Sequence, residues 1–211
     1  MISLKTEYNK LENTVTEQGN EIALFGLSNK TNQILVIGVV HGDEFQGEYL
    51  IDRYMNETKK EDVLFLPCLN PDGRDLKTRT NSNKVDLNRN FPTKNWALGE
   101  RDNYFGGEKP ASEIETRFLC EVIEKYKPSS IITLHTPYKI VNYDGPAKEL
   151  AEMISAIMDY PVKEGIGYPT PGSFGTYAGV ERGIPTITLE MDEEIEVEKL
   201  YPPIKMVFDK L

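Results

Sequence analysis

The hydrophobic positions of this 211-residue chain form short apolar runs separated by amphipathic segments and polar turns. The run at 34–40 (ILVIGVV) is continuous rather than alternating, which is typical of a strand buried on both faces of a sheet. The polar segment SNKTNQ between it and the run at 21–27 predicts a hairpin. Further apolar runs predict strands at 63–68, 130–135 and 185–191.

Helical periodicity predicts four helices between these strands, at 44–54, at 113–126, after Gly145, and at 194–209 with a break around Pro202 and Pro203. Strands that alternate with helices predict an α/β fold, with a mixed, mostly parallel central sheet and helices on both faces. No linker or repeat interrupts the pattern, so we expect a single domain over residues 1–211. Periodicity is absent from Asn70 to Lys109, and a loop of that length inside a compact domain is usually functional.

The composition narrows the possible partners and compartment. The chain has 24 Lys and Arg against 34 Asp and Glu, a net charge of −10, which argues against nucleic acid or an anionic membrane as a partner. The longest apolar run, 34–40, is far shorter than the roughly 20 residues that span a bilayer. The first twenty residues lack the apolar core of a secretory signal, and Cys68 and Cys120 are interpreted as buried free thiols. We therefore expect a cytoplasmic protein, and the oligomeric state stays open.

Both histidines of the chain, His41 and His135, come directly after or at the end of a predicted buried strand. Ligands of open α/β sheets bind beyond the carboxyl ends of the strands, so this is the place to look for chemistry. Glu44 follows His41 by three residues, and one helical turn places such a pair on the same side. Two histidines and one glutamate can hold a zinc ion with one position open, although a lone histidine at a strand end can equally be a core residue.

Glu190 closes the last predicted strand and is a candidate for proton transfer. The alternative is a solvated carboxylate, because three further acidic residues follow at 192–194. The long loop also supplies Arg74, Arg79 and Arg89, which suit recognition of a carboxylate or stabilisation of an oxyanion. These arginines could instead brace the loop through ion pairs with its aspartates, Asp72, Asp75 and Asp86.

Five segments, taken in order, resemble motifs of the zinc carboxypeptidase family. They are His41-Gly-Asp-Glu44, Asn70-Pro-Asp-Gly73, Asp86-Leu-Asn-Arg-Asn-Phe91, Leu134-His135 and Leu189-Glu190. The resemblance implies that one zinc ion is bound by His41, Glu44 and His135, and that Glu190 is the general base and acid. It also implies that Asn88 and Arg89 hold a substrate carboxylate and that Arg79 polarises the scissile carbonyl, with Arg74 as the rival. The mobile tyrosine of the family would be Tyr168, with Tyr177 as the alternative.

Within that family, the segments 141–146 and 167–179 resemble the bacterial murein peptide amidase A group. This resemblance implies a small murein peptide as substrate, cleaved at the amide between the γ-carboxyl of D-glutamate and meso-diaminopimelate. A second reading is an N-acyl-amino-acid deacylase related to aspartoacylase, against which the segment Gly167-Tyr-Pro-Thr-Pro-Gly172 argues. A third is a peptide-binding module without turnover, against which the complete set of ligands together with Glu190 argues.

Overall fold

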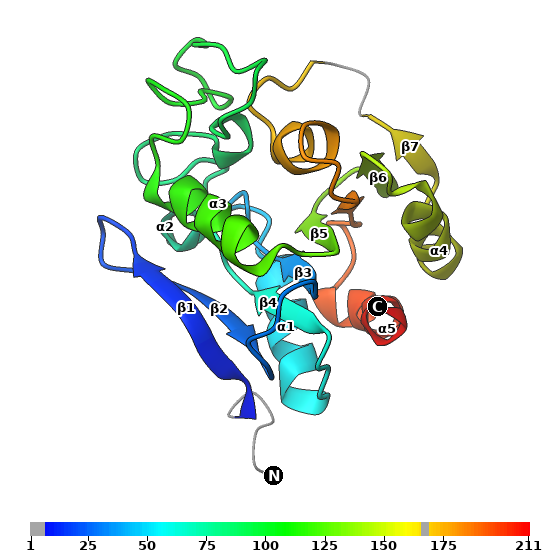
Figure 1. Ribbon diagram of the computed structural model, residues 1–211. Coiled ribbons are helices and arrows are strands. Elements are labelled where there is room, and N and C mark those ends of the chain that lie inside the picture. The colour runs from blue at the N-terminus through cyan, green and yellow to red at the C-terminus, as the bar shows by residue number, and fades with distance from the viewer. Residues whose placement is uncertain (1–6, 166–168) are drawn as a thin grey trace.

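The computed structural model describes residues 7–165 and 169–211, and one eight-stranded sheet runs through them (Figure 1). The strand order is β1-β2-β4-β3-β5-β8-β6-β7. Strands β4, β3, β5 and β8 are mutually parallel, whereas β1, β2 and β6 join antiparallel neighbours. The mixed, mostly parallel sheet predicted from the sequence is thus confirmed. The strands are β1 (Asn9–Val15), β2 (Glu21–Gly26), β3 (Ile34–Ile37), β4 (Val63–Leu66), β5 (Ser130–His135), β6 (Ile140–Asp144), β7 (Val162–Glu164) and β8 (Thr186–Glu190).

The hairpin predicted for 21–27 and 34–40 is wrong. Strand β4 lies between β2 and β3, so β2 pairs with β1 and β4, while β3 pairs with β4 and β5. The reason is burial: Leu35, Val36 and Ile37 have no exposed surface, and a strand that is apolar on both sides belongs in the middle of a sheet covered on both faces. That requirement outweighs the local preference of the polar connection for a turn.

Helices cover both faces of the sheet, as predicted (Figure 1). Helices α1 (Gln46–Glu57), α4 (Lys148–Met158) and α5 (Val197–Lys210) pack on one face, and α3 (Ile114–Tyr126) packs on the other together with the π-helical turn η3 (Thr176–Val180). The break predicted in the last helix does not occur, because α5 continues through Pro202 and Pro203. Its buried face, which includes Leu200, Ile204 and Phe208, holds the helix together despite the missing backbone donors.

The long segment from Asn70 to Lys109 contains more structure than its lost periodicity suggested. Helix α2 (Pro71–Leu76) begins at Asn70, whose side chain accepts a hydrogen bond from the Gly73 N–H at 2.9 Å, and Pro71 occupies the first turn. A 3₁₀ turn, η2 (Leu87–Arg89), follows, capped by the side chain of Asp86. The segment is therefore a folded cover over one end of the sheet rather than a structureless loop.

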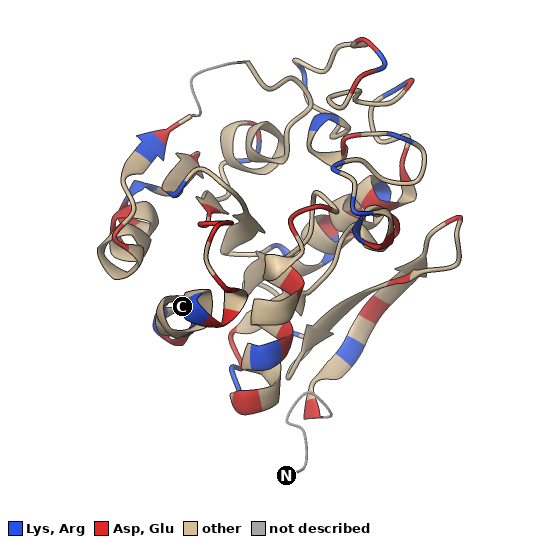
Figure 2. Ribbon diagram, turned by 180° about the vertical axis from the view of Figure 1, so that it is seen from behind, with Lys and Arg blue, Asp and Glu red and all other residues tan. Residues whose placement is uncertain are grey.

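Charged residues lie mainly on β1, the helices and the loops, while the central strands are almost entirely uncharged (Figure 2). In residues 7–165 and 169–211, no helix has both the length and the apolar content needed to span a bilayer. Cys68 and Cys120 are both free thiols, the first buried and the second half-buried.

Candidate active site and metal centre

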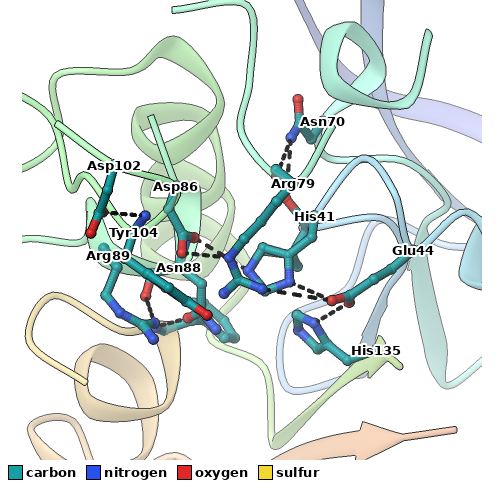
Figure 3. Close-up of polar contacts among 12 residues, drawn as sticks. His41, Glu44, Asn70, Arg79, Asp86, Asn88, Arg89, Asp102, Tyr104 and His135 are labelled. Atoms are coloured by element: carbon teal, nitrogen blue, oxygen red, sulfur yellow. Dashed lines mark hydrogen bonds and ion pairs between the residues drawn. The ribbon is translucent and has the colours of Figure 1, made fainter. Parts of the chain in front are cut away.

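His41, Glu44 and His135 meet beyond the carboxyl ends of β3 and β5 (Figure 3). Oε1 of Glu44 lies 2.8 Å from Nδ1 of His41, and Oε2 lies 2.7 Å from Nδ1 of His135. One ligand atom from each residue falls within 4.8 Å of the others, and none of the three residues is more than 9% exposed. The sheet and the turn before α1 thus bring His41 and Glu44 together with His135, which follows Glu44 by 91 positions in the chain.

The electrostatics of this cluster favour a bound cation. Burial by itself lowers the pKa of His41, but the carboxylates of Glu44 and Asp86 outweigh that effect and raise it to about 9. Burial alone would raise the pKa of Glu44, yet the two imidazoles hold it below its ordinary range. Two imidazole nitrogens and a carboxylate, all directed at one buried point, are a donor set that suits zinc and similar divalent ions. The residues therefore fit a metal ion.

Asp86 connects the cluster to the long loop and has no exposed surface. Its Oδ1 lies 3.2 Å from Nε2 of His41, and its Oδ2 accepts a hydrogen bond from Nε of Arg79 at 2.9 Å. A carboxylate on the outer nitrogen of a metal-binding histidine fixes the ring and its tautomer. From the sequence, Asp86 was expected only as an ion-pair partner of the loop arginines, although its place in Asp86-Leu-Asn-Arg89 was a usable signal.

Glu190 lies at the end of β8, paired in register with His135 at the end of β5. It is 7% exposed, and within the described residues its Oε2 has no hydrogen-bond partner. Burial raises the pKa of this carboxyl to about 7. The alternative of a solvated strand-end carboxylate does not hold. Glu190 is a buried, partly unsatisfied acid beside the metal cluster, with the properties of a group that exchanges protons near neutral pH.

The arginines of the long loop separate into two environments. Arg79, Asn88 and Arg89 line a cavity of about 230 Å³. Glu190 and two members of the cluster, His41 and Glu44, line it as well. Arg74 lies outside it and is held by Glu48 at 2.6 Å and Asp75 at 2.9 Å, so the bracing interpretation describes Arg74.

Arg89 is only 7% exposed. Among the residues with described positions, it has no ion-pair partner, whereas Arg79 pairs with Asp86. The carboxylate of Asp86 acts on Arg89 only at longer range, and a buried cation without a directly bonded counter-ion is unusual in a folded protein. Arg89 is thus placed to bind an anion that enters the cavity.

Of the two candidates for the mobile tyrosine, only the alternative can be placed. Tyr168 lies outside the described residues. Tyr177 is buried at 1% exposure, packs on Phe91 and Arg182, and does not line the cavity, so it is a core residue. Tyr104 and Tyr138 do line the cavity, and the sequence analysis missed both. Nothing in a single sequence marks them, because each lies in an irregular segment without helical or strand periodicity.

Comparison with known proteins agrees with this geometry. Residues 4–207 match the family described as Zinc carboxypeptidase (Peptidase M14). The chain is 35% identical over 158 residues to murein peptide amidase A of Escherichia coli K12, a match that spans 68% of this chain and 64% of that protein. It is 34% identical over 185 residues to murein peptide amidase A of Vibrio campbellii, spanning 78% and 73% of the two chains.

The crystal structure of murein-tripeptide amidase MpaA from Escherichia coli O157 superposes with a TM-score of 0.81 at 29% identity, covering 93% of this chain and 88% of that one. The family match extends over nearly the whole chain, and the three clustered residues are of the metal-binding kind. The chain therefore belongs to the zinc carboxypeptidase family.

Proposed function

We propose that this protein is a zinc-dependent amidase that acts in the cytoplasm on murein peptides, cleaving the γ-D-glutamyl bond to meso-diaminopimelate. The observation that carries the proposal is the position of Arg89, a buried cation in the same cavity as His41, Glu44 and Glu190 that has no ion-pair partner among the described residues. It supplies the counter-charge for a carboxylate next to the scissile amide. The similarity to two murein peptide amidases and to the murein-tripeptide amidase structure supports this substrate class.

The proposed mechanism assigns a task to each residue around the cavity. His41, Glu44 and His135 would hold zinc, which supplies Lewis acidity and makes hydroxide available at neutral pH. Glu190 accepts a proton from the attacking water and then passes it to the amine nitrogen that leaves. Arg79 donates to the carbonyl oxygen as negative charge develops there, and Asp86 keeps its guanidinium in place. Asn88 and Arg89 hold the carboxylate of the leaving residue.

Two polar residues of β6, on the same sheet face as Glu190 but outside the residues that line the cavity, suit a leaving residue with a charged side-chain end. Asn142 of β6 lies opposite Thr188 of β8, one pleat away from Glu190, and Asp144 follows on the same face. Asn142 is 6% exposed, and in the described part of the chain its Oδ1 accepts no hydrogen bond. Diaminopimelate carries an ammonium and a carboxylate at the far end of its side chain, and an amide oxygen and a carboxylate can bind that ammonium.

Mass spectrometry of a reaction with L-alanyl-γ-D-glutamyl-meso-diaminopimelate tests the proposal. Zinc-loaded protein should release free diaminopimelate and the dipeptide, and it should hydrolyse N-acetyl-aspartate far more slowly. Glu190→Gln protein, prepared in the same way, is the matched control for a contaminating peptidase. Release of aspartate instead of diaminopimelate would favour the deacylase reading and contradict the proposal.

A further inference from the structure

Tyr104 is an exposed aromatic residue with two arginines on its ring (Figure 3). The guanidinium carbon of Arg79 lies 5.0 Å from the ring centroid, and that of Arg89 lies 5.8 Å from it. Both are within the distance at which a cation is attracted by the ring quadrupole. A single side chain therefore contacts both of the cations that line the catalytic cavity.

The position of this ring is set by its neighbours and not by burial of the ring itself. Phe105 is 4% exposed and its carbonyl accepts the Asp86 N–H at 2.8 Å, which ties the loop to the residue that holds Arg79. A Cβ on Gly106 would collide with the carbonyl of Arg89, so a glycine there allows the loop to approach that residue. The Tyr104 N–H donates to the side chain of Asp102 at 2.7 Å. Tyr104 itself is 56% exposed and contributes little to the core.

The Tyr104 ring restrains the two guanidinium groups for different reasons. Arg79 is anchored at Nε by Asp86, while Arg89 has no ion pair within the described residues and donates from Nη1 to the Asn88 carbonyl at 2.7 Å. Two like charges in one small cavity also repel each other. An electron-rich ring in contact with both guanidinium groups reduces that repulsion and limits the orientations that each of them can adopt.

We propose that Tyr104 is a positioning residue for substrate recognition, whose aromatic ring holds Arg79 and Arg89 in the orientation that binds the substrate's carboxylate and carbonyl. The contribution comes from the ring and does not require the hydroxyl. This inference rests on the proposed roles of the two arginines in the same cavity. It assigns a function to an exposed residue that the sequence analysis did not select.

The first experiment uses succinate, a simple dicarboxylate, as the probe and does not depend on turnover. Isothermal titration of the zinc-loaded protein should show about tenfold weaker binding for Tyr104→Leu, and Tyr104→Phe should stay within about twofold of the wild type. Tyr49→Leu, an exposed tyrosine on α1 that does not line this cavity, is the matched control and should leave binding unchanged. Equal affinity of the wild type and Tyr104→Leu, or no succinate binding by the wild type, would overturn the inference.

The second experiment separates this inference from the proposed function. With the murein tripeptide, Tyr104→Leu should raise KM by about tenfold and lower kcat less, and Tyr104→Phe should restore both. If the wild type fails to cleave the tripeptide but succinate binding still depends on the ring, the proposed function fails and the role of Tyr104 stands. If the tripeptide is cleaved equally well by Tyr104→Leu, the function stands and the role of Tyr104 is refuted.

Discussion

The two faces of the sheet at β5 and β8 differ sharply, although their residues alternate along the same strands. Ile132 and Leu134 of β5 face the core formed with α1, α4 and α5, and they have no exposed surface. On the other face, His135 and Glu190 are also almost fully buried, yet their neighbours are polar and Oε2 of Glu190 has no partner among the described atoms. At the carboxyl ends of these strands, one face stabilises the fold, while the other keeps buried polar groups that lower stability and are available for chemistry.

The largest expected effect comes from His135 on the polar face. His135→Ala removes one of two imidazoles from the cluster, so tight zinc binding and turnover should both fall by more than about a hundredfold, beyond the range found for outer-shell partners of metal ligands. Zinc content after dialysis and the rate of tripeptide cleavage measure this. Full zinc occupancy in the variant would show that the cluster is not the metal site.

Substitution of Leu134, the neighbour of His135, tests whether the apolar face of β5 stabilises the fold. Leu134→Ala leaves a cavity in the core and should lower the free energy of unfolding by about 3 kcal/mol. Because the side chain points away from the cavity, the folded variant should retain its zinc and its KM. Urea unfolding and tripeptide kinetics below the transition check both parts. A loss of unfolding free energy smaller than about 1 kcal/mol, or an inactive variant that is still folded, would contradict the division of roles between the two faces.

Unfolding of the metal-free protein over a pH series measures how much the buried carboxyl of Glu190 lowers stability. Burial raises the pKa of Glu190 from 4.5 to about 7, so the folded protein binds more protons than the unfolded chain between those values. The contribution of Glu190 to stability therefore falls as pH rises through that window. Glu190→Gln removes this loss, and its stability relative to the wild type should improve by about 2 kcal/mol between pH 5 and pH 8.

Chemical denaturation in the presence of a chelator gives this difference directly. Thr188→Val, on the same strand and face without a titrating group, is the control and should show no such trend. If the difference in unfolding free energy between Glu190→Gln and the wild type does not change with pH, burial does not raise the pKa of Glu190.

The smallest expected effect concerns the substrate's far end. Asn142→Leu replaces an unsatisfied amide with an apolar side chain, so stability should be unchanged or slightly higher. For the diaminopimelate tripeptide, kcat/KM should fall about tenfold, the loss typical of a hydrogen bond to a charged group. The variant should cleave a tripeptide ending in norleucine, which lacks both the distal ammonium and the distal carboxylate, no worse than the wild type does. An equal loss with both substrates would remove Asn142 from recognition.

The central part of the fold could be predicted because its strands are continuous apolar runs with no alternative to burial. Strands β3 and β5 and helix α3 illustrate this, since their patterns leave little freedom. Pairing was harder to predict: the segment between β2 and β3 has the composition of a turn, and the position of β4 between them depends on contacts distant in sequence. Strands β6 and β7 are short and partly polar, so their pattern resembles a loop.

The candidate site was predictable where residue type and strand end coincide, as for His41, His135 and Glu190. The choice between Arg74 and Arg79 required coordinates, because both lie in the same polar segment and differ only in which carboxylates surround them. Tyr104 could not be found from the sequence, since its significance is the distance of one ring from two guanidinium groups.

The most direct test of the account compares zinc content and tripeptide turnover in the same preparation of Glu190→Gln protein. We expect one zinc per chain, as in the wild type, together with a rate lowered by at least about a hundredfold, the effect of removing a general base. Turnover near that of the wild type in the variant, or loss of its zinc, would contradict the separation of metal binding and proton transfer on which the account is built.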